Sequence, residues 1–370
     1  MTKLHSLTEL GQSVWLDDIR RSYLMSGRLK ELIAQGVRGV TSNPSIFHRA
    51  IAGSAEYDRQ IEELACIGQS AYQIYEALIL DDVGQAADQL RPLYDETGGA
   101  DGYVSLEVSP RLAHDTRGTI AQAQRLYSTL GRPNVMIKVP GTAEGLPAIR
   151  ALIGARVNVN VTLLFSLPQY EAVLEAYLAG MEDMAAVGGD LSAVASVASF
   201  FVSRIDTAVD AALDELGHDE LKGEAAIASA RVAYAHYCAV AEDERWQELA
   251  RRGARMQRPL WASTSTKNPR YPDTLYVDNL IGPDTVNTMP LATMDAFLDH
   301  GAVATTVTAG LDEARNHLAR LAELGIEVTE VGERLQSDGV AAFVESFDAL
   351  QDALADKRIE CADITNGHQD

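Results

Sequence analysis

The sequence predicts an α/β fold, a single (β/α)8 TIM barrel with an additional long helical segment near residues 219–252. Short β-rich runs alternate with segments whose apolar residues recur at helical spacing, a pattern that favours βα units and a parallel sheet. Eight such units fall within about 300 residues, which suits a closed barrel. A doubly wound open sheet is the alternative, but no glycine-rich nucleotide fingerprint opens any of the expected helices. The closed barrel is therefore favoured.

Eight runs rich in β-branched and other apolar residues are the expected strands, and long helical patterns follow most of them. The strands are expected at 13–19, 37–43, 102–109, 134–140, 157–165, 196–203, 258–265 and 284–290. Apolar residues at helical spacing fill 70–94 and 166–187. The Ala- and Glu-rich span 219–252 indicates one long helix or a pair of helices.

No internal repeat, low-complexity tract or linker divides the chain, so residues 1–370 are expected to form one domain. We expect a frayed tail over 358–370, because the end of this segment is polar and aperiodic.

The charge balance limits what the protein binds. With 31 Lys and Arg residues against 53 Asp and Glu residues, the formal net charge is −22. This charge argues against non-specific binding to nucleic acid or to an anionic membrane. A phosphate-bearing ligand would therefore need a local cluster of positive side chains. The most apolar window, 191–202, is too short to span a bilayer.

The cysteines and the N-terminus predict a cytoplasmic location. Cys66, Cys238 and Cys361 are widely spaced and odd in number, which suits a reducing compartment. The first residues contain no apolar region typical of a secretory signal.

Side chains alternate between the two faces of a strand, so sequence parity sorts them. In four expected strands one parity collects polar groups: Asn158, Asn160 and Thr162; Ser105, Glu107 and Ser109; Ser263, Ser265 and Lys267; and Lys138, which shares its face with Met136. Helices cover the outer face of a barrel, so these sets should point inward. A half-solvated antiparallel sheet is the alternative, and it fits poorly because helical patterns follow the strands.

Lys138 lies in an apolar strand that Pro140 ends, so its ammonium should lie near the barrel mouth. Burial disfavours the charged form of a lysine. A neutral amine is a nucleophile that condenses with ketones to a Schiff base, which acts as an electron sink for C–C cleavage. The alternative is a structural ion pair with Glu107 on a neighbouring strand, and the chemistry of these residues alone does not choose between the two.

Five blocks of the sequence resemble signatures of the transaldolase family. They are 37–47, 135–152, 158–166, 199–206 and 263–268. The blocks occur in the family's order, cover most of the chain, and with the extended 219–252 segment resemble the longer bacterial subgroup. The resemblance implies a class I Schiff-base aldolase barrel that transfers a dihydroxyacetone unit from sedoheptulose 7-phosphate to glyceraldehyde 3-phosphate. The products would be erythrose 4-phosphate and fructose 6-phosphate, in the pentose phosphate pathway.

The resemblance also implies catalytic roles. Lys138 matches the lysine that forms the imine, and Asp17 matches the carboxylate that moves the proton of the hydroxyl where the bond breaks. Glu107 and Thr162 match the pair that holds the water used to form and hydrolyse the imine. Parity places only one residue of the Asp17–Asp18 pair inward, and we choose Asp17.

Substrate-binding residues follow from the same resemblance. Asn43, Asn160 and Ser199 match groups that bind the ketose hydroxyls, with Thr41 and Phe201 beside them; Arg204 matches the main phosphate arginine, and Ser265 and Lys267 align with a serine and a second basic residue. That second residue is often arginine in the family, and lysine lacks the bidentate fork of arginine. Asn43 precedes Pro44 and could equally cap a helix.

Other functions remain as alternatives. A related Schiff-base aldolase would release free dihydroxyacetone, and a non-catalytic sugar-phosphate sensor would keep only the barrel. The scattered histidines lack zinc-ligand spacing, which argues against a metal-dependent aldolase, and we expect no metal and no cofactor. The expected partners are sugar phosphates, with no nucleic acid or membrane, in a monomer or homodimer.

Overall fold

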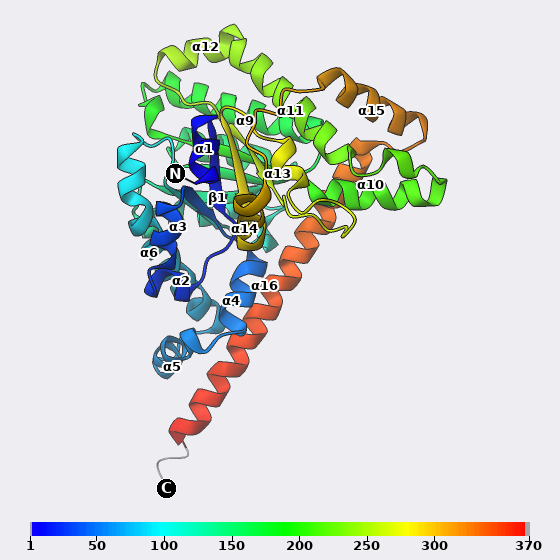
Figure 1. The fold of residues 1–370 in the computed structure, drawn as a ribbon. Coiled ribbons are helices and arrows are strands. Elements are labelled where there is room, and N and C mark those ends of the chain that lie inside the picture. Colours follow the sequence, from blue (N-terminus) through cyan, green and yellow to red (C-terminus); the bar gives the residue numbers. More distant parts are fainter. Residues whose placement is uncertain (1, 367–370) are drawn as a thin grey trace.

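Eight parallel strands close into a barrel in the order of the chain, β1-β2-β3-β4-β5-β6-β7-β8 (Figure 1). The computed structural model describes residues 2–366, with side chains described as far as residue 358. The strands are β1 (Gln12–Leu16), β2 (Val37–Thr41), β3 (Tyr103–Glu107), β4 (Val135–Pro140), β5 (Val159–Leu164), β6 (Ser196–Phe201), β7 (Arg258–Ala262) and β8 (Thr285–Met289). Each overlaps one of the eight predicted runs, so the predicted closed (β/α)8 barrel is confirmed.

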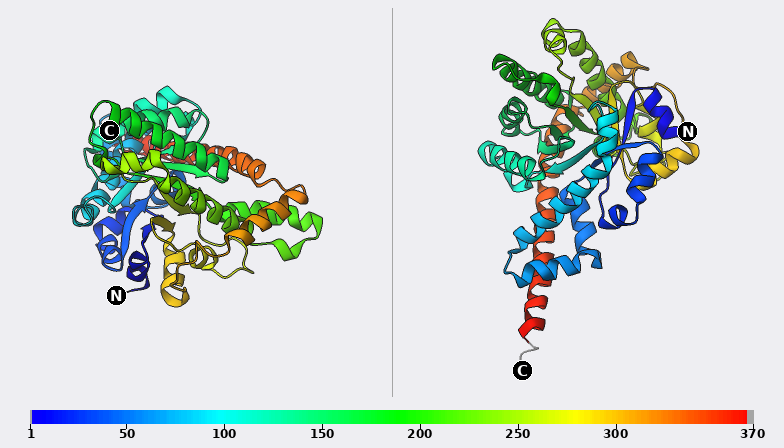
Figure 2. Two further views of the ribbon diagram at one scale, coloured as in Figure 1. Left: turned by 90° about the horizontal axis from the view of Figure 1, so that it is seen from above. Right: turned by 90° about the vertical axis from the view of Figure 1, so that its left-hand side faces the viewer.

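Helices surround the strands (Figure 2). They are α1 (Lys3–Glu9), α2 (Arg21–Met25), α3 (Arg28–Ala34), α4 (Pro44–Ala52), α5 (Asp58–Cys66), α6 (Ala71–Glu96), α7 (Thr116–Leu130), α8 (Gly145–Gly154), α9 (Leu167–Ala186), α10 (Ser203–Leu216), α11 (Ala225–Glu242), α12 (Glu244–Arg251), α13 (Leu275–Asn279), α14 (Leu291–His300), α15 (Leu311–Glu323) and α16 (Val328–Asn366). The predicted helical patterns 70–94 and 166–187 correspond to α6 and α9. Within the described residues, no helix is long and apolar enough to cross a membrane.

The extra segment 219–252 forms a pair of helices, α11 and α12, after a short 3-10 turn at Asp219–Leu221. The helical backbone of α16 continues to Asn366. The frayed tail expected from residue 358 therefore stays a prediction, and residues 367–370 lie outside the described part of the chain.

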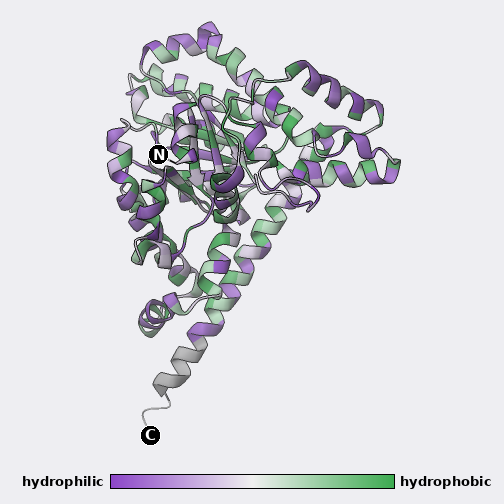
Figure 3. Ribbon diagram, in the orientation of Figure 1, coloured by the Kyte–Doolittle hydropathy of each residue, from purple (hydrophilic) through white to green (hydrophobic). Residues whose placement is uncertain are grey.

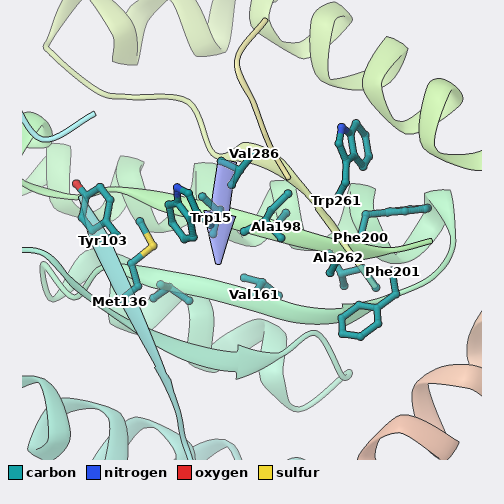
Figure 4. Packing of buried hydrophobic residues seen from close by; sticks show 14 of the residues in the cluster. Trp15, Tyr103, Met136, Val161, Ala198, Phe200, Phe201, Trp261, Ala262 and Val286 are labelled. Atoms are coloured by element: carbon teal, nitrogen blue, oxygen red, sulfur yellow. The ribbon is translucent and has the colours of Figure 1, made fainter. Parts of the chain in front are cut away.

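Large side chains, two of them aromatic, fill the half of the barrel interior nearest the N-terminal ends of the strands. Figure 4 shows Trp15, Tyr103 and Met136 close together, with the Trp15 and Tyr103 ring centroids 6.3 Å apart. Gly39 on β2 makes room for the indole, because a Cβ there would lie 2.6 Å from the Trp15 ring. These side chains therefore fill the barrel interior toward the N-terminal ends of its strands.

Paired charged groups also lie at the N-terminal end of the barrel. Asp101 accepts hydrogen bonds from Ser13 Oγ at 2.7 Å and from Arg38 Nε at 2.8 Å, and Arg258 Nη2 lies 3.2 Å from its Oδ1. Asp101 is buried, so its two arginine partners satisfy a charge that would otherwise be costly to desolvate.

The long helix α16 crosses the C-terminal mouth of the barrel and lies against α4, α5 and α6 (Figure 1). Gln336 Nε2 donates to the carbonyl oxygens of Gly141 and Leu163, both at 3.0 Å. Gly339 permits this close approach, because a Cβ there would lie 2.8 Å from Leu163 Cδ2. Hydrophobic and hydrophilic residues are interspersed along the helix (Figure 3), as expected for one face buried on the barrel.

Candidate active site

A cavity of about 290 Å³ opens at the C-terminal ends of the strands, beneath α16. Ten of the twelve predicted site residues line it: Asp17, Thr41, Asn43, Lys138, Thr162, Ser199, Phe201, Arg204, Ser265 and Lys267. The other two, Glu107 and Asn160, are buried beside the lining residues that they contact. The structure therefore brings the whole predicted set together at the end of the barrel where (β/α)8 enzymes place their active sites.

Lys138 and Glu107 form a buried ion pair at the centre of this site. The register of β3 and β4 places the two residues side by side, with Lys138 Nζ 3.1 Å from Glu107 Oε2. Each side chain is 5% exposed, and Lys138 Nζ also donates to the carbonyl oxygen of Ser42 at 3.2 Å. Burial raises the pKa of Glu107, and the Lys138 ammonium opposes that rise. The ion pair that the sequence left as an alternative is thus present, and it lies where a nucleophilic lysine would be needed.

Asp17 lies just beyond the end of β1 and lines the cavity, whereas Asp18 does not. Asp17 Oδ1 accepts a hydrogen bond from Thr41 Oγ1 at 2.7 Å, and Thr41 in turn contacts Thr288 Oγ1 at 2.6 Å. Asp18 pairs with Arg20 at 2.8 Å, and burial raises its pKa. The parity choice between the two carboxylates therefore agrees with their placement.

A short hydrogen-bonded chain orders the polar groups beside Lys138. Ser199 Oγ donates to Asn160 Oδ1 at 2.7 Å, and Asn160 Nδ2 donates to Ser105 Oγ at 3.0 Å, which fixes the amide of Asn160. Thr162 Oγ1 is buried and has no hydrogen-bond partner among the described residues, and Glu107 Oε2 has only the Lys138 ammonium, 3.1 Å away. Buried polar atoms are usually paired, so an unpaired Thr162 hydroxyl beside the Lys138–Glu107 pair indicates a functional site.

Asn43 has both of the roles that its sequence context allows. Its Oδ1 accepts from the backbone N–H of Ile46 at 2.9 Å, which caps α4, and the residue also lines the cavity. The cap leaves the side-chain Nδ2 for a second partner.

Positive side chains gather on the opposite wall. Arg204, in the first turn of α10, lines the cavity with its guanidinium 5.4 Å from the Phe201 ring. Lys267 Nζ donates to Ser265 Oγ at 2.8 Å. Within the described residues neither cation has a carboxylate within ion-pair distance, and burial lowers the pKa of Arg204. In a chain of net charge −22, two unpaired cations in one cavity indicate an anionic ligand.

The predicted reason for the placement of Ser263 was wrong. β7 ends at Ala262, and Ser263 shares its strand parity with Trp261, which packs against Phe200. Ser263 nevertheless lines the cavity because its backbone is left-handed, with φ of 55°. Ser265 and Lys267 therefore reach the mouth on a loop and not by the alternation of a strand.

The sequence reasoning missed several lining residues. Thr288 shares its strand face with Val286, and the predicted strand carries polar residues on both faces, so parity alone did not identify it. Ser45 and Arg49 lie four positions apart on α4, a spacing that places both on one helix face. Phe343 of α16 is 4% exposed, and its ring centroid is 5.6 Å from Lys138 Nζ. No local signal identifies Phe343, because a distant helix brings it to the mouth.

A closed (β/α)8 barrel with a buried lysine–carboxylate pair at the C-terminal ends of its strands is typical of aldolases that act through a lysine. The family model for transaldolase/fructose-6-phosphate aldolase matches residues 14–354, and the chain belongs to this family.

Named relatives are similar over nearly the full length. A transaldolase of Thermobifida fusca (strain YX) is 51% identical over 357 residues, covering 95% of this chain and 97% of the relative. Transaldolase 1 of Streptomyces avermitilis is 51% identical over 357 residues, with 95% and 94% covered. Transaldolase 2 of Nostoc sp. (strain PCC 7120) is 47% identical over 369 residues, with 96% and 97% covered.

Proposed function

We propose that this protein is a transaldolase that moves a dihydroxyacetone unit from sedoheptulose 7-phosphate to glyceraldehyde 3-phosphate, giving erythrose 4-phosphate and fructose 6-phosphate. The observation that carries the proposal is the buried Lys138–Glu107 pair, which shares one cavity with Asp17 and with two unpaired cations. Membership of the family supports the same reaction.

In the proposed mechanism Lys138 passes its proton to Glu107, and the freed amine attacks the ketose carbonyl carbon. Glu107 and Thr162, whose buried hydroxyl has no partner among the described residues, hold the water that leaves when the imine forms and returns when it is hydrolysed. Asp17 takes the proton of the hydroxyl on the carbon of the breaking bond that becomes the aldehyde, and it returns a proton to the oxygen of the acceptor aldehyde when the new bond forms. The protonated imine accepts the electron pair of the broken C–C bond, so the reaction includes its own electron sink.

The remaining side chains hold the sugar. Arg204, Lys267 and Ser265 bind the terminal phosphate, and Asn43, Asn160 and Ser199 bind hydroxyls near the imine. Thr41 positions Asp17 through its 2.7 Å hydrogen bond, and Phe201 forms the apolar wall under the Arg204 guanidinium.

Phe343 supports transfer over release of free dihydroxyacetone. Its ring covers Lys138, and α16 is held to the mouth by the bonds of Gln336. An apolar cover limits access of bulk water to the bound intermediate, so the intermediate persists until an acceptor aldehyde enters. The complete set of lysine, acids and threonine argues against a non-catalytic sensor, which would not need proton-transfer groups.

Reduction with borohydride in the presence of fructose 6-phosphate tests the proposal. Lys138 should become irreversibly modified, as located by peptide mass mapping, and Lys138→Arg should abolish both labelling and turnover because a guanidinium is not nucleophilic near neutral pH. Lys267, the other lysine that lines the cavity, is the internal control, and Lys267→Arg should still be labelled at Lys138. Labelling at another lysine, or none, contradicts the mechanism.

The cellular setting is part of the proposal. The apolar patterns and cysteines of the sequence support a single-domain protein acting in the cytoplasm on sugar phosphates, without nucleic-acid or membrane partners. Whether it acts as a monomer or as a homodimer is measured directly by size-exclusion chromatography with light scattering.

A further inference from the structure

The extra helical segment builds a second cavity, distinct from the barrel mouth. A space of about 330 Å³ lies between the start of α11, α15 and the loop that leads into α13, and we call it the α11–α15 cavity. Helices α11 and α15 pack on each other, so its two long walls come from segments far apart in the chain. The residues proposed for catalysis and substrate binding are not part of this lining.

Two side chains of this cavity each have a buried nitrogen without a hydrogen-bond partner among the described residues. His317 is 9% exposed in its side chain, its Nε2 has no partner, and its Nδ1 lies 4.0 Å from Glu224 Oε2, beyond hydrogen-bond range. Arg231 has a buried Nε without a partner, and its Nη2 makes only a 3.4 Å contact with Asn279 Oδ1. Buried polar atoms are usually paired, so two unpaired nitrogens in side chains that line one cavity mark it as a candidate binding site.

The charges around the cavity define what would fit. Arg231 contributes a fixed positive charge, and burial lowers the pKa of His317, which leaves a neutral imidazole with one donor and one acceptor nitrogen. Glu224 and Glu313 lie at the exposed rim and attract Arg231 without a hydrogen bond to it. Arg231 therefore offers a positive charge to a compact anion, and the neighbouring carboxylates suit groups that donate hydrogen bonds.

From these contacts we propose that the α11–α15 cavity is a binding site for a sugar phosphate, with the phosphate against Arg231 and His317 and the sugar hydroxyls toward Glu224 and Glu313. Arginine is well suited to phosphate because its planar fork offers parallel N–H donors. This inference goes beyond the proposed reaction and assigns a role to the extra segment.

The same cavity touches the loop that serves the barrel mouth. Tyr271 lines it and lies on the 263–274 loop, which carries Ser265 and Lys267 to the proposed phosphate end of the active site. Tyr271 Oη donates to Asp210 Oδ2 at 2.5 Å, and Asp210 Oδ1 accepts from the backbone N–H of Gly223 at 3.0 Å. An occupant that contacts Tyr271 would thus restrain this loop, and backbone exchange along 263–274 reports on it.

The test is calorimetric titration with ribose 5-phosphate in an Arg204→Ala background, which weakens phosphate binding at the barrel mouth. The proposal expects one molecule bound per chain. Adding Arg231→Gln should weaken this binding about 10- to 150-fold, as expected for loss of hydrogen bonds to a charged group. His317→Gln, a second variant, should weaken it less. Arg315→Gln, an arginine on α15 outside the cavity, is the matched control and should leave binding unchanged.

Hydrogen exchange supplies the second readout. Ribose 5-phosphate should slow backbone exchange in 263–274 in the Arg204→Ala protein and should not do so once Arg231→Gln is added. Absence of binding in the Arg204→Ala background, or equal affinity with and without Arg231→Gln, overturns the proposal. Failure of the proposed reaction would be seen separately, because Arg231→Gln alone leaves borohydride labelling at Lys138 intact.

Discussion

Replacing Arg204 by alanine should separate recognition of the sugar phosphate from stability of the fold. In the structure the Arg204 guanidinium has no carboxylate partner among the described residues, and burial lowers its pKa, which means that burial works against its charge. Without substrate the charge is thus an unfavourable feature, and its removal leaves no orphaned carboxylate. The melting temperature of Arg204→Ala should equal or exceed that of the parent protein.

Catalysis should respond in the opposite direction. Hydrogen bonds to a charged partner contribute about 1.5–3 kcal/mol, and each 1.4 kcal/mol is about a factor of ten. Arg204→Ala should therefore lower kcat/KM for glyceraldehyde 3-phosphate about 10- to 150-fold. Lys267→Ala should lower it less, because an ammonium lacks bidentate geometry.

The assay compares phosphorylated and unphosphorylated acceptors at a saturating, fixed concentration of fructose 6-phosphate. Use of glyceraldehyde, which lacks the phosphate, should suffer much less in both variants. Arg204→Lys restores the charge without the fork and should recover part of the loss. An equal loss for the two acceptors, or a melting temperature lowered by several degrees, would refute the reasoning and make Arg204 a structural residue.

Three further predictions concern other parts of the structure. Asp17→Ala should keep imine formation but slow C–C cleavage about 10²–10⁴-fold in single-turnover kinetics, whereas Asp18→Ala should act mainly on stability; the reverse pattern would show that the parity choice was wrong. Phe343→Leu, and more strongly Phe343→Ala, should raise the ratio of free dihydroxyacetone to transfer product. An unchanged ratio would show that the Phe343 ring does not protect the bound intermediate from water. Burial raises the pKa of Asp206 to about 7, above its value in the unfolded chain, so the protonated carboxyl stabilises the fold at low pH and this contribution is lost as the pH rises through that value. Asp206→Asn should therefore flatten the fall in unfolding free energy between about pH 4 and pH 7, by less than about 4 kcal/mol, in urea titrations; an equally steep fall in the variant would contradict the prediction.

Strand periodicity predicted most of this site because a barrel converts parity directly into inside and outside. Glu107, Lys138 and Asn160 share the inner face for that reason, and the register of β3, β4 and β5 places them side by side. Parity failed where a strand ends, because the left-handed backbone of Ser263 turns the chain toward the mouth. A serine in the sequence does not by itself indicate a positive φ.

Residues brought by tertiary packing were also beyond local patterns. Phe343 belongs to a helix whose own spacing gives only a buried face, and the sequence does not say which surface that face covers. The pairing of α11 with α15 across the second cavity is equally a product of packing, so the role of the extra segment could be approached only in three dimensions.

The position of Phe343 has a consequence for biosynthesis. All eight strands are complete at Met289, whereas the aromatic cover of the lysine follows in α16. On the ribosome all eight strands are therefore synthesised before the residue that covers the lysine, and the covered site forms only after the last helix leaves the exit tunnel. A chain that ended before α16 would contain Lys138 and Glu107 but not the ring that covers them, so the cover of the site depends on complete synthesis of the C-terminal helix.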